Sequence, residues 1–317
     1  MKILVTGGCG YVGSVLVPTL LEVLGCEVVV YDTQWFGRNL VEHPKLTIIK
    51  GDVRNIPDEV FSGVETVIHL ANIANDPAVE LDPTLSWEVN VLATYRMIEG
   101  AKKAGVQNFI FASSGSVYGV KEEKFVTEDL ELVPISVYNK TKMIAERVLY
   151  SYREQVRVVC IRPATVCGLA ERLRLDVSVN MLTYQALKNG VITVFGGQQI
   201  RPNIHIKDLV SVYMHFIENP KIDSGFYNAG FENLSINAIA KKIAGLTGAE
   251  VKITESNDPR SYRQDSSKLL ATGFSPQYKV EDAINELVAK YQRNELIEKD
   301  IYYTVKTMKL LIENGEL

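Results

Sequence analysis

The chain contains few cysteines and few histidines, and this scarcity excludes several classes of protein. It has four of each among 317 residues, with no CxxC motif and no histidine spaced for metal binding. Disulfide scaffolds and structural zinc modules need more of both, so we expect neither disulfides nor a bound metal. The cysteines fall in segments typical of buried strands or glycine turns: Cys9, Cys26, Cys160 and Cys167. This pattern favours the reducing cytoplasm as the compartment.

Long hydrophobic runs and an excess of positive charge are also missing. The most apolar stretch, residues 15–31, is broken by a proline, a glycine and two glutamates, so it predicts no membrane span. The first eight residues hold too short an apolar run for a signal peptide. The net charge of −4 leaves no broad basic surface for nucleic acid or an anionic membrane. We therefore expect neither partner, and an anionic ligand must be bound by local groups.

The composition is otherwise that of an ordinary globular protein. Hydrophobic residues make up 46% of the chain and charged residues 23%, and no internal repeat or low-complexity segment interrupts it. A chain of this length buries about three quarters of the surface that its unfolded form exposes. It therefore supports one large domain, or one large domain and one small one.

Short apolar runs alternate with longer helical patterns through the first half of the chain. The expected strands are β-branched runs at 3–6, 28–31, 47–50, 66–70, 109–112 and 156–161. Apolar strands separated by helices predict a parallel sheet that is covered on both faces. We therefore predict an α/β fold with a Rossmann-type, doubly wound parallel sheet.

The pattern loosens after residue 167, which predicts a smaller substrate-binding cap interleaved with the sheet domain. We expect a strand at 200–206 and helices at 175–189, 207–219, 236–245 and 280–292. The sheet domain is assigned residues 1–167, with 200–232 returning to it, and the cap residues 168–199 and 233–317. Apolar residues at helical spacing after Asn294 predict a docked helix, and a subunit contact is one role that the sequence leaves open.

A glycine-rich turn follows the first expected strand. Residues 6–13, Thr-Gly-Gly-Cys-Gly-Tyr-Val-Gly, read as GxGxxG or, one residue earlier, as GxxGxxG. Such glycines let the backbone approach a pyrophosphate, whose charge the following helix N-terminus offsets. Asp32 ends the second expected strand, where a carboxylate accepts from a ribose 2′-hydroxyl and repels a 2′-phosphate. The turn predicts NAD rather than NADP, and a structural glycine turn with a solvated Asp32 is the alternative.

Tyr138 and Lys142 stand four residues apart at the start of an expected helix, so both side chains lie on one face. A nearby ammonium lowers the pKa of a phenol from its usual value near 10, toward the range where tyrosine exchanges protons with a sugar hydroxyl. The pair follows the serine-rich segment 113–119, which comes directly after an expected strand, where doubly wound sheets bind ligands. A serine hydroxyl there can orient the reacting oxygen, and a polar capping turn is the alternative.

Taken in order, these motifs resemble the extended short-chain dehydrogenase/reductases that act on nucleotide sugars, the epimerase/dehydratase group that includes UDP-glucose 4-epimerases. The resemblance runs from residue 1 to about residue 290. It is carried by the glycine loop, Asp32, His69-Leu70-Ala71, Asn90, Ser113-Ser114-x-Ser116-Val117-Tyr118-Gly119, Tyr138-x-x-x-Lys142, Arg162-Pro163 and Arg201-x-x-Ile204-His205-Ile206-x-Asp208. It implies that Ser114, Tyr138 and Lys142 are catalytic and that Asn90 matches the family's structural asparagine.

The resemblance and the glycine loop together define an expected cofactor site. Asp52 follows the third expected strand, where it can meet the adenine, although a turn or cap role is equally open. The expected NAD-binding residues are Gly7, Gly10, Tyr11, Val12, Gly13, Asp32, Asp52, Val53, Leu70, Ala71, Asn90, Tyr138 and Lys142.

The substrate side follows from the same resemblance. Asn180 and Arg201 match residues that bind the diphosphate of the sugar nucleotide, and an arginine fork pairs well with phosphate oxygens. Tyr262 is implied on the diphosphate, with Arg260 and Arg263 beside it, and a solvated charged loop is the alternative for these two arginines. The expected substrate-binding residues are Ser114, Tyr138, Asn180, Arg201 and Tyr262. The expected substrate is a UDP-sugar, with GDP- and dTDP-sugars as alternatives, and the expected assembly is a homodimer.

Departures from the family pattern favour one reaction class. Dehydratases of the family carry an Asp-Glu pair after the residue that matches Ser114, and decarboxylases carry a Glu two residues after it. This chain has Gly115 and Ser116, so elimination lacks its acid and base. We therefore predict an NAD-dependent nucleotide-sugar 4-epimerase that acts through a 4-keto intermediate. A net 4-dehydrogenase or 4-ketoreductase is the alternative, followed by a dehydratase or a non-catalytic NAD sensor.

Overall fold

The six apolar runs expected to be strands, together with a seventh strand at Gly225–Ala229 that the sequence did not predict, form one seven-stranded sheet in which every neighbouring pair is parallel. The structure, a computed structural model, describes residues 1–255 and 261–317. Across the sheet the strands lie in the order β10-β6-β5-β4-β1-β2-β3. Their bounds are β1 (Lys2–Thr6), β2 (Glu27–Asp32), β3 (Leu46–Lys50), β4 (Thr66–His69), β5 (Asn108–Ala112), β6 (Arg157–Pro163) and β10 (Gly225–Ala229). The predicted doubly wound α/β fold is confirmed.

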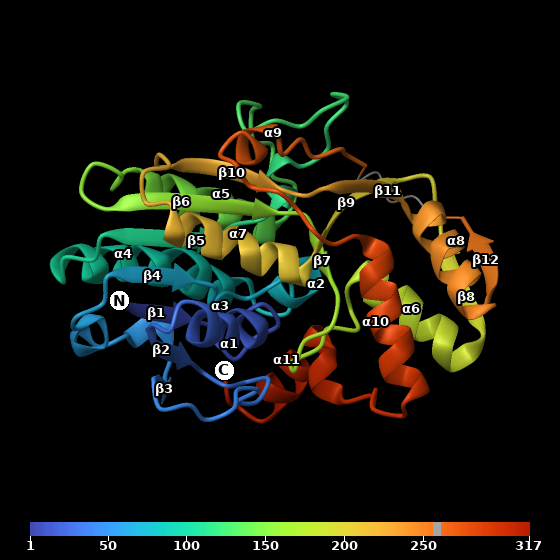
Figure 1. The fold of residues 1–317 in the computed structure, drawn as a ribbon, viewed down its shortest axis with the longest axis horizontal. Coiled ribbons are helices and arrows are strands. Elements are labelled where there is room, and N and C mark those ends of the chain that lie inside the picture. Colours follow the sequence, from blue (N-terminus) through green and yellow to red (C-terminus); the bar gives the residue numbers. More distant parts are fainter. Residues whose placement is uncertain (256–260) are drawn as a thin grey trace.

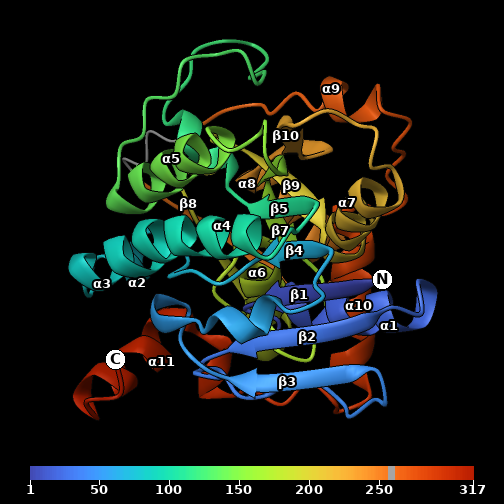
Figure 2. The same cartoon turned by 90° about the vertical axis from the view of Figure 1, so that its left-hand side faces the viewer.

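Apolar side chains alternate between the two faces of the sheet, and helices cover both faces. In β1, Ile3 and Val5 pack into the core on one face, whereas Leu4 packs into the core on the other. Figure 2 shows α1 and α7 on one side of the sheet and α4 and α5 on the other. The helices that flank the sheet are α1 (Gly13–Val23), α2 (Asp76–Val79), α3 (Pro83–Trp87), α4 (Ala93–Lys103), α5 (Val137–Tyr150) and α7 (Ile206–Glu218).

The cap lies beside the carboxyl ends of the strands (Figure 1). Its own core is formed by three helices that pack against a two-stranded sheet. These elements are α6 (Ser178–Asn189), α8 (Ile236–Thr247), α10 (Val280–Gln292), β8 (Val191–Phe195) and β12 (Glu250–Thr254). A three-stranded sheet and a short helix complete the fold: β7 (Thr165–Cys167), β9 (Ile200–His205), β11 (Glu232–Ser235) and α9 (Ser267–Leu270).

The strand order reverses at β1. The chain runs outward from β1 to β2 and β3, and then crosses back to β4 on the other side of β1. Ligands of doubly wound sheets bind outside the carboxyl ends of the strands at such a point. The segments that follow β1, β2 and β4 therefore surround one crevice between the sheet and the cap.

The tail folds back from the cap onto the sheet domain. Its helix α11 (Thr304–Glu313) packs beside α2, and Met308 and Leu311 join the core on that face of the sheet. The docked helix expected from the sequence is present, and it docks on its own chain. Within the described ranges, no helix is both long enough and apolar enough to cross a bilayer.

A buried ion pair joins α5 to the sheet. Tyr138, Lys142 and Glu146 are spaced by four residues and so share one face of this helix. Glu146 accepts hydrogen bonds from Nε and Nη2 of Arg162 at 2.9 and 2.7 Å, and both side chains are almost fully buried. Nη1 of Arg162 donates to the hydroxyl of Tyr118 at 2.8 Å, and this hydroxyl donates in turn to Asn228. The pair therefore links the helix to β6 and β10.

We expect Glu146→Gln to lower the free energy of unfolding by about 3–5 kcal/mol, because it leaves the Arg162 charge buried without a partner. The double replacement Glu146→Leu with Arg162→Met should cost less than the single one, since it removes both charges. Urea unfolding measures these differences. Glu281→Gln, which breaks the exposed pair with Lys242, is the matched control and should change stability little. Equal effects of Glu146→Gln and Glu281→Gln would contradict the prediction.

Candidate active site

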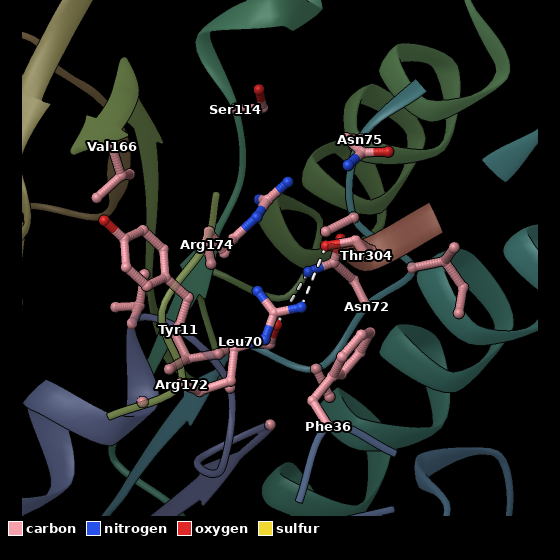
Figure 3. Close-up of a pocket in the computed structure, with 18 of the residues that line it drawn as sticks. Tyr11, Phe36, Leu70, Asn72, Asn75, Ser114, Val166, Arg172, Arg174 and Thr304 are labelled. Carbon is pink, nitrogen blue, oxygen red and sulfur yellow. Dashed lines mark hydrogen bonds between the residues drawn. The ribbon is translucent and has the colours of Figure 1, made fainter. Parts of the chain in front are cut away.

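A cavity of about 610 Å³ lies at the reversal point of the sheet. Figure 3 shows Ser114 at one end of the view and Phe36 at the other, with Arg172 and Arg174 between them. Most of the sequence-predicted residues line it, namely Gly7, Gly10, Tyr11, Val12, Gly13, Asp32, Asp52, Val53, Leu70, Ala71, Ser114, Tyr138, Lys142, Arg201 and Tyr262. The structure therefore brings together residues from both halves of the chain.

The glycine turn needs glycine at two positions for steric reasons. Gly7 has a φ of +71°, and a Cβ there would lie 2.6 Å from the backbone nitrogen of Ala71. A Cβ on Gly13 would lie 2.4 Å from the carbonyl oxygen of Gly8. The first contact brings the turn against the segment after β4, and the second lets α1 begin directly behind the turn. A side chain at either position would collide with the backbone and distort the turn that leads into α1.

The two predicted acidic residues are held in different ways. Asp32 accepts hydrogen bonds from the backbone nitrogens of Cys9 and Gln34 at 2.9 and 2.6 Å, and its burial raises its pKa. It thus lies against the glycine turn with a carboxylate at the cavity wall. Asp52 accepts from the backbone nitrogen of Arg54 and pairs with its guanidinium at 2.7 Å. Asp52 therefore lines the cavity and caps a turn at the same time.

Ser114, Tyr138 and Lys142 meet at the carboxyl end of β5. Tyr138 lies in the first turn of α5, whose N-cap residue Ser136 accepts from the backbone nitrogen of Asn139 at 3.1 Å. Nζ of Lys142 donates to the carbonyl oxygen of Ala112 at 2.7 Å. The hydroxyl oxygen of Ser114 lies 2.8 Å from that of Ser116, at the N-terminus of a short 3₁₀ turn.

The pKa of Tyr138 differs from the sequence expectation. Burial raises it to about 12, against the opposing effects of a hydrogen bond with Ser114 and the charge of Arg174. Burial also lowers the pKa of Lys142 to about 7. The prediction that Lys142 lowers the pKa of Tyr138 is therefore wrong for the cofactor-free protein, because loss of water dominates for both groups. The phenol therefore holds its proton at neutral pH in the cofactor-free protein.

Asn90 and Asn180 are buried and are not among the residues that line the cavity, so the ligand contacts expected of them stay predictions, while Asn90 has the internal contacts of a structural asparagine. Oδ1 of Asn90 accepts from the backbone nitrogen of Ile73 at 2.8 Å, and its Nδ2 donates to the carbonyl oxygen of the same residue. Oδ1 of Asn180 accepts from the backbone nitrogen of Gly168 at 3.0 Å, and its Nδ2 approaches the hydroxyl of Tyr11 at 3.1 Å. Because these amides are used internally, each asparagine positions residues that do line the cavity.

The predicted diphosphate-binding segment is described in part. Arg201, on β9, and Tyr262 both line the cavity. Arg263 is exposed and is not among the lining residues, which agrees with the alternative that it belongs to a solvated charged loop. Arg260 lies outside the described residues.

The sequence did not point to Arg172, Arg174 and Thr304, which also line the cavity. A signal was present for the two arginines, since they alternate with Leu173 and Leu175, which are buried in a core of the cap. Thr304 had no such signal, because it reaches the cavity only through the path of the tail.

Phosphate-binding glycines at the reversal point of a parallel sheet are typical of dinucleotide-dependent enzymes. The tyrosine and lysine on one face of α5 narrow this class to the short-chain dehydrogenase/reductases. The model of the NAD dependent epimerase/dehydratase family matches residues 3–230. The chain belongs to this family.

Known proteins similar to the chain along most of its length include epimerases and a decarboxylase. The uncharacterized UDP-glucose epimerase YtcB of Bacillus subtilis (strain 168) is 29% identical, over 91% of this chain and 97% of that protein. UDP-glucuronic acid decarboxylase 1 of Danio rerio is 28% identical, over 92% and 73%. UDP-glucuronic acid 4-epimerase from Bacillus cereus, solved with UDP-glucuronic acid and NAD, is 27% identical with a TM-score of 0.84, over 93% and 100%.

Membership of this family, together with the similar structures solved with NAD, establishes NAD as the cofactor. The residues present fit it, because the glycine turn lines the cavity at the start of α1 and Asp32 offers a carboxylate at the end of β2. The choice of reaction rests on the site itself.

We expect the stability of the nucleotide-free protein to rise with pH above about 7. Burial lowers the pKa of Lys142 to about 7 from 10.5, so between these values the unfolded chain binds a proton that the folded chain does not. This adds up to about 1.4 kcal/mol per pH unit. Lys142→Met removes the effect, so the unfolding free energy of the variant minus that of the wild type should fall as the pH rises from about 7 to about 10.

Urea unfolding at several pH values provides the measurement, and Lys140→Met, an exposed lysine on the same helix, is the control. If the unfolding free energy of Lys142→Met minus that of the wild type stays constant with pH, the buried lysine does not cause the pH dependence of stability.

Proposed function

We propose that the chain is an NAD-dependent nucleotide-sugar 4-epimerase that acts through a transient 4-keto sugar. The observation that carries the proposal is the absence, among the described residues, of a free carboxylate beside Ser114 in a cavity that holds Tyr138 and Lys142. Each described carboxylate of the cavity wall is engaged by a backbone N–H, an arginine or a hydroxyl: Asp32, Asp52, Asp76 and Asp176. Two residues after Ser114 stands a second hydroxyl, that of Ser116. Elimination needs a carboxylate there, whereas epimerisation does not.

The chain's own residues supply the proton chemistry and the binding. Tyr138 takes the proton of the C4 hydroxyl and later returns it, and the hydroxyl of Ser114 orients the oxygen. Lys142 fixes α5, which carries Tyr138, against the end of β5 through its hydrogen bond to the carbonyl oxygen of Ala112. NAD, when bound, accepts a hydride from C4 and gives it back. Arg201 and Tyr262 bind the diphosphate of the substrate, a role that their position in the cavity wall supports.

An epimerase needs room for its keto sugar to turn. The segment 195–201, one residue shorter than the family pattern, contributes only Arg201 to the cavity wall among the described residues. We favour a UDP-sugar as substrate, because the relatives and the solved structure reported above are named for UDP-sugars, with GDP- and dTDP-sugars as alternatives.

Three further parts of the proposal concern the whole molecule. We propose residues 1–167 and 200–232 as the NAD-binding domain and the remainder as the substrate-binding region. We propose a homodimer in the cytoplasm; the location is supported by four cysteines that are all free and buried.

The direct test is to incubate the purified protein with UDP-, GDP- and dTDP-sugars without adding a cofactor, and to analyse the products. We expect one of these sugars to be converted to its C4 epimer, with no lasting absorbance from reduced nicotinamide. Tyr138→Phe should lower the rate by about two orders of magnitude or more while the protein stays folded. Tyr150→Phe, on the same helix but away from the cavity, should retain the rate.

A different result would favour the alternative. Release of a 4-keto sugar together with reduced nicotinamide when NAD is added would identify a 4-dehydrogenase. A 5,6-unsaturated or a 4-keto-6-deoxy sugar as product would identify a lyase and overturn the proposal.

A further inference from the structure

Arg172 is a buried arginine in the wall of the cavity. Its side chain is 3% exposed, and its guanidinium lies 4.2 Å from the ring centre of Phe36. Nη2 donates to the hydroxyl of Thr304 at 3.1 Å, which Figure 3 shows as a dashed line. Nε has no hydrogen-bond partner. A buried polar group of this kind calls for a partner, and the cavity is where one can enter.

The charge of Arg172 is not balanced by the protein. Within residues 1–255 and 261–317 it forms no ion pair, and Asp176, the acidic group that acts on it, is held by Arg174 at 2.8 Å. Burial and the charge of Arg174 lower the pKa of Arg172 to about 9, so it remains a cation at neutral pH. A buried cation without a partner is costly, and an anion bound in the cavity would offset the cost.

The position of Arg172 identifies the anion. Its backbone nitrogen approaches the hydroxyl of Ser14, in the first turn of α1, at 3.4 Å. Phe36, against which its guanidinium packs, follows Asp32 at the end of β2. Arg172 therefore lies at the glycine-turn end of the cavity, and Ser114 lies at the far end of the view in Figure 3. The group expected beside the glycine turn is the diphosphate of a dinucleotide.

We propose that Arg172 binds the diphosphate of the NAD cofactor and that Thr304, from the C-terminal helix, positions its guanidinium. The first role adds a charge-assisted contact to the backbone contacts of the glycine turn. The second makes α11 part of the cofactor site. The proposal rests on the use of NAD and holds whichever reaction the enzyme catalyses.

The tail is fastened to the segment of Arg172 at two further points. The backbone nitrogen of Thr304 donates to Oδ2 of Asp176 at 2.9 Å, and that of Leu175 donates to the carbonyl oxygen of Tyr302 at 2.9 Å. Val305 and Met308 of α11 also line the cavity. A cofactor held by Arg172 is thus connected to the tail, which suits an enzyme that keeps its cofactor between turnovers.

The test is calorimetric titration of the full-length protein, freed of bound nucleotide, with ADP-ribose and separately with UDP. ADP-ribose carries the diphosphate of the cofactor without its nicotinamide. Arg172→Met should raise the Kd of ADP-ribose by about 10- to 100-fold, as expected for a hydrogen-bonded charge pair, and leave the Kd of UDP unchanged. Arg172→Lys keeps the charge but loses the planar fork, so its Kd for ADP-ribose should lie between those of the wild type and Arg172→Met.

Arg157→Met is the matched control. Arg157 donates to the carbonyl oxygen of Ile222 and to Asn108 at the amino ends of β6 and β5, away from the cavity. Its loss should therefore lower thermal stability without changing the Kd of ADP-ribose. An unchanged Kd of ADP-ribose in Arg172→Met, or a larger loss for UDP than for ADP-ribose, would overturn the assignment. Since no turnover is measured, this outcome is independent of the proposed epimerase reaction.

The positioning role of Thr304 has its own test. Thr304→Val should weaken ADP-ribose binding less than Arg172→Met does, and Thr304→Ser, which keeps the hydroxyl, should retain wild-type affinity. In the Arg172→Met background, Thr304→Val should have no further effect, because its action passes through the guanidinium. Equal weakening by Thr304→Val in both backgrounds would show that Thr304 acts by another route.

Discussion

The arrangement of the active site depends on one buried pair of opposite charges, Glu146 and Arg162. The pair lies where water does not reach, so each charge needs the other. Glu146 stands one helical turn beyond Lys142, which itself stands one turn beyond Tyr138, so fixing the carboxylate fixes the face that carries the reactive groups. Through Tyr118, the same pair is connected to β10. The Arg-Pro motif of the family thus has a structural function in this chain.

The electrostatics of the site follow from this burial. Tyr138 keeps its proton, and Lys142 is easily discharged, because the surroundings of both are poor in water. A positive charge bound beside the phenol would lower its pKa toward a range useful for proton exchange. The role assigned to Tyr138 therefore depends on the bound cofactor as well as on Lys142, and retention of the cofactor becomes part of the chemistry.

Local patterns were enough to predict the sheet and the positions of most cavity residues, because strand ends and glycine turns are determined by residues close in sequence. They did not indicate the internal hydrogen bonds of the Asn180 amide with Gly168 and Tyr11, because only the folded chain brings these residues together. The contact between Arg172 and Thr304 joins residues 132 positions apart, and no local pattern could indicate it. The strand at 200–206 was predicted, whereas five strands of three to five residues were missed because such short runs carry little pattern: β7, β8, β10, β11 and β12.

The central claim is that the hydrogen removed from C4 returns to the same carbon on the opposite face. The most direct measurement uses a nucleotide sugar that the protein converts, carrying deuterium at C4, with the product analysed by NMR. The account predicts deuterium retained at an inverted C4. Release of a 4-keto sugar with the deuterium on the nicotinamide would contradict it.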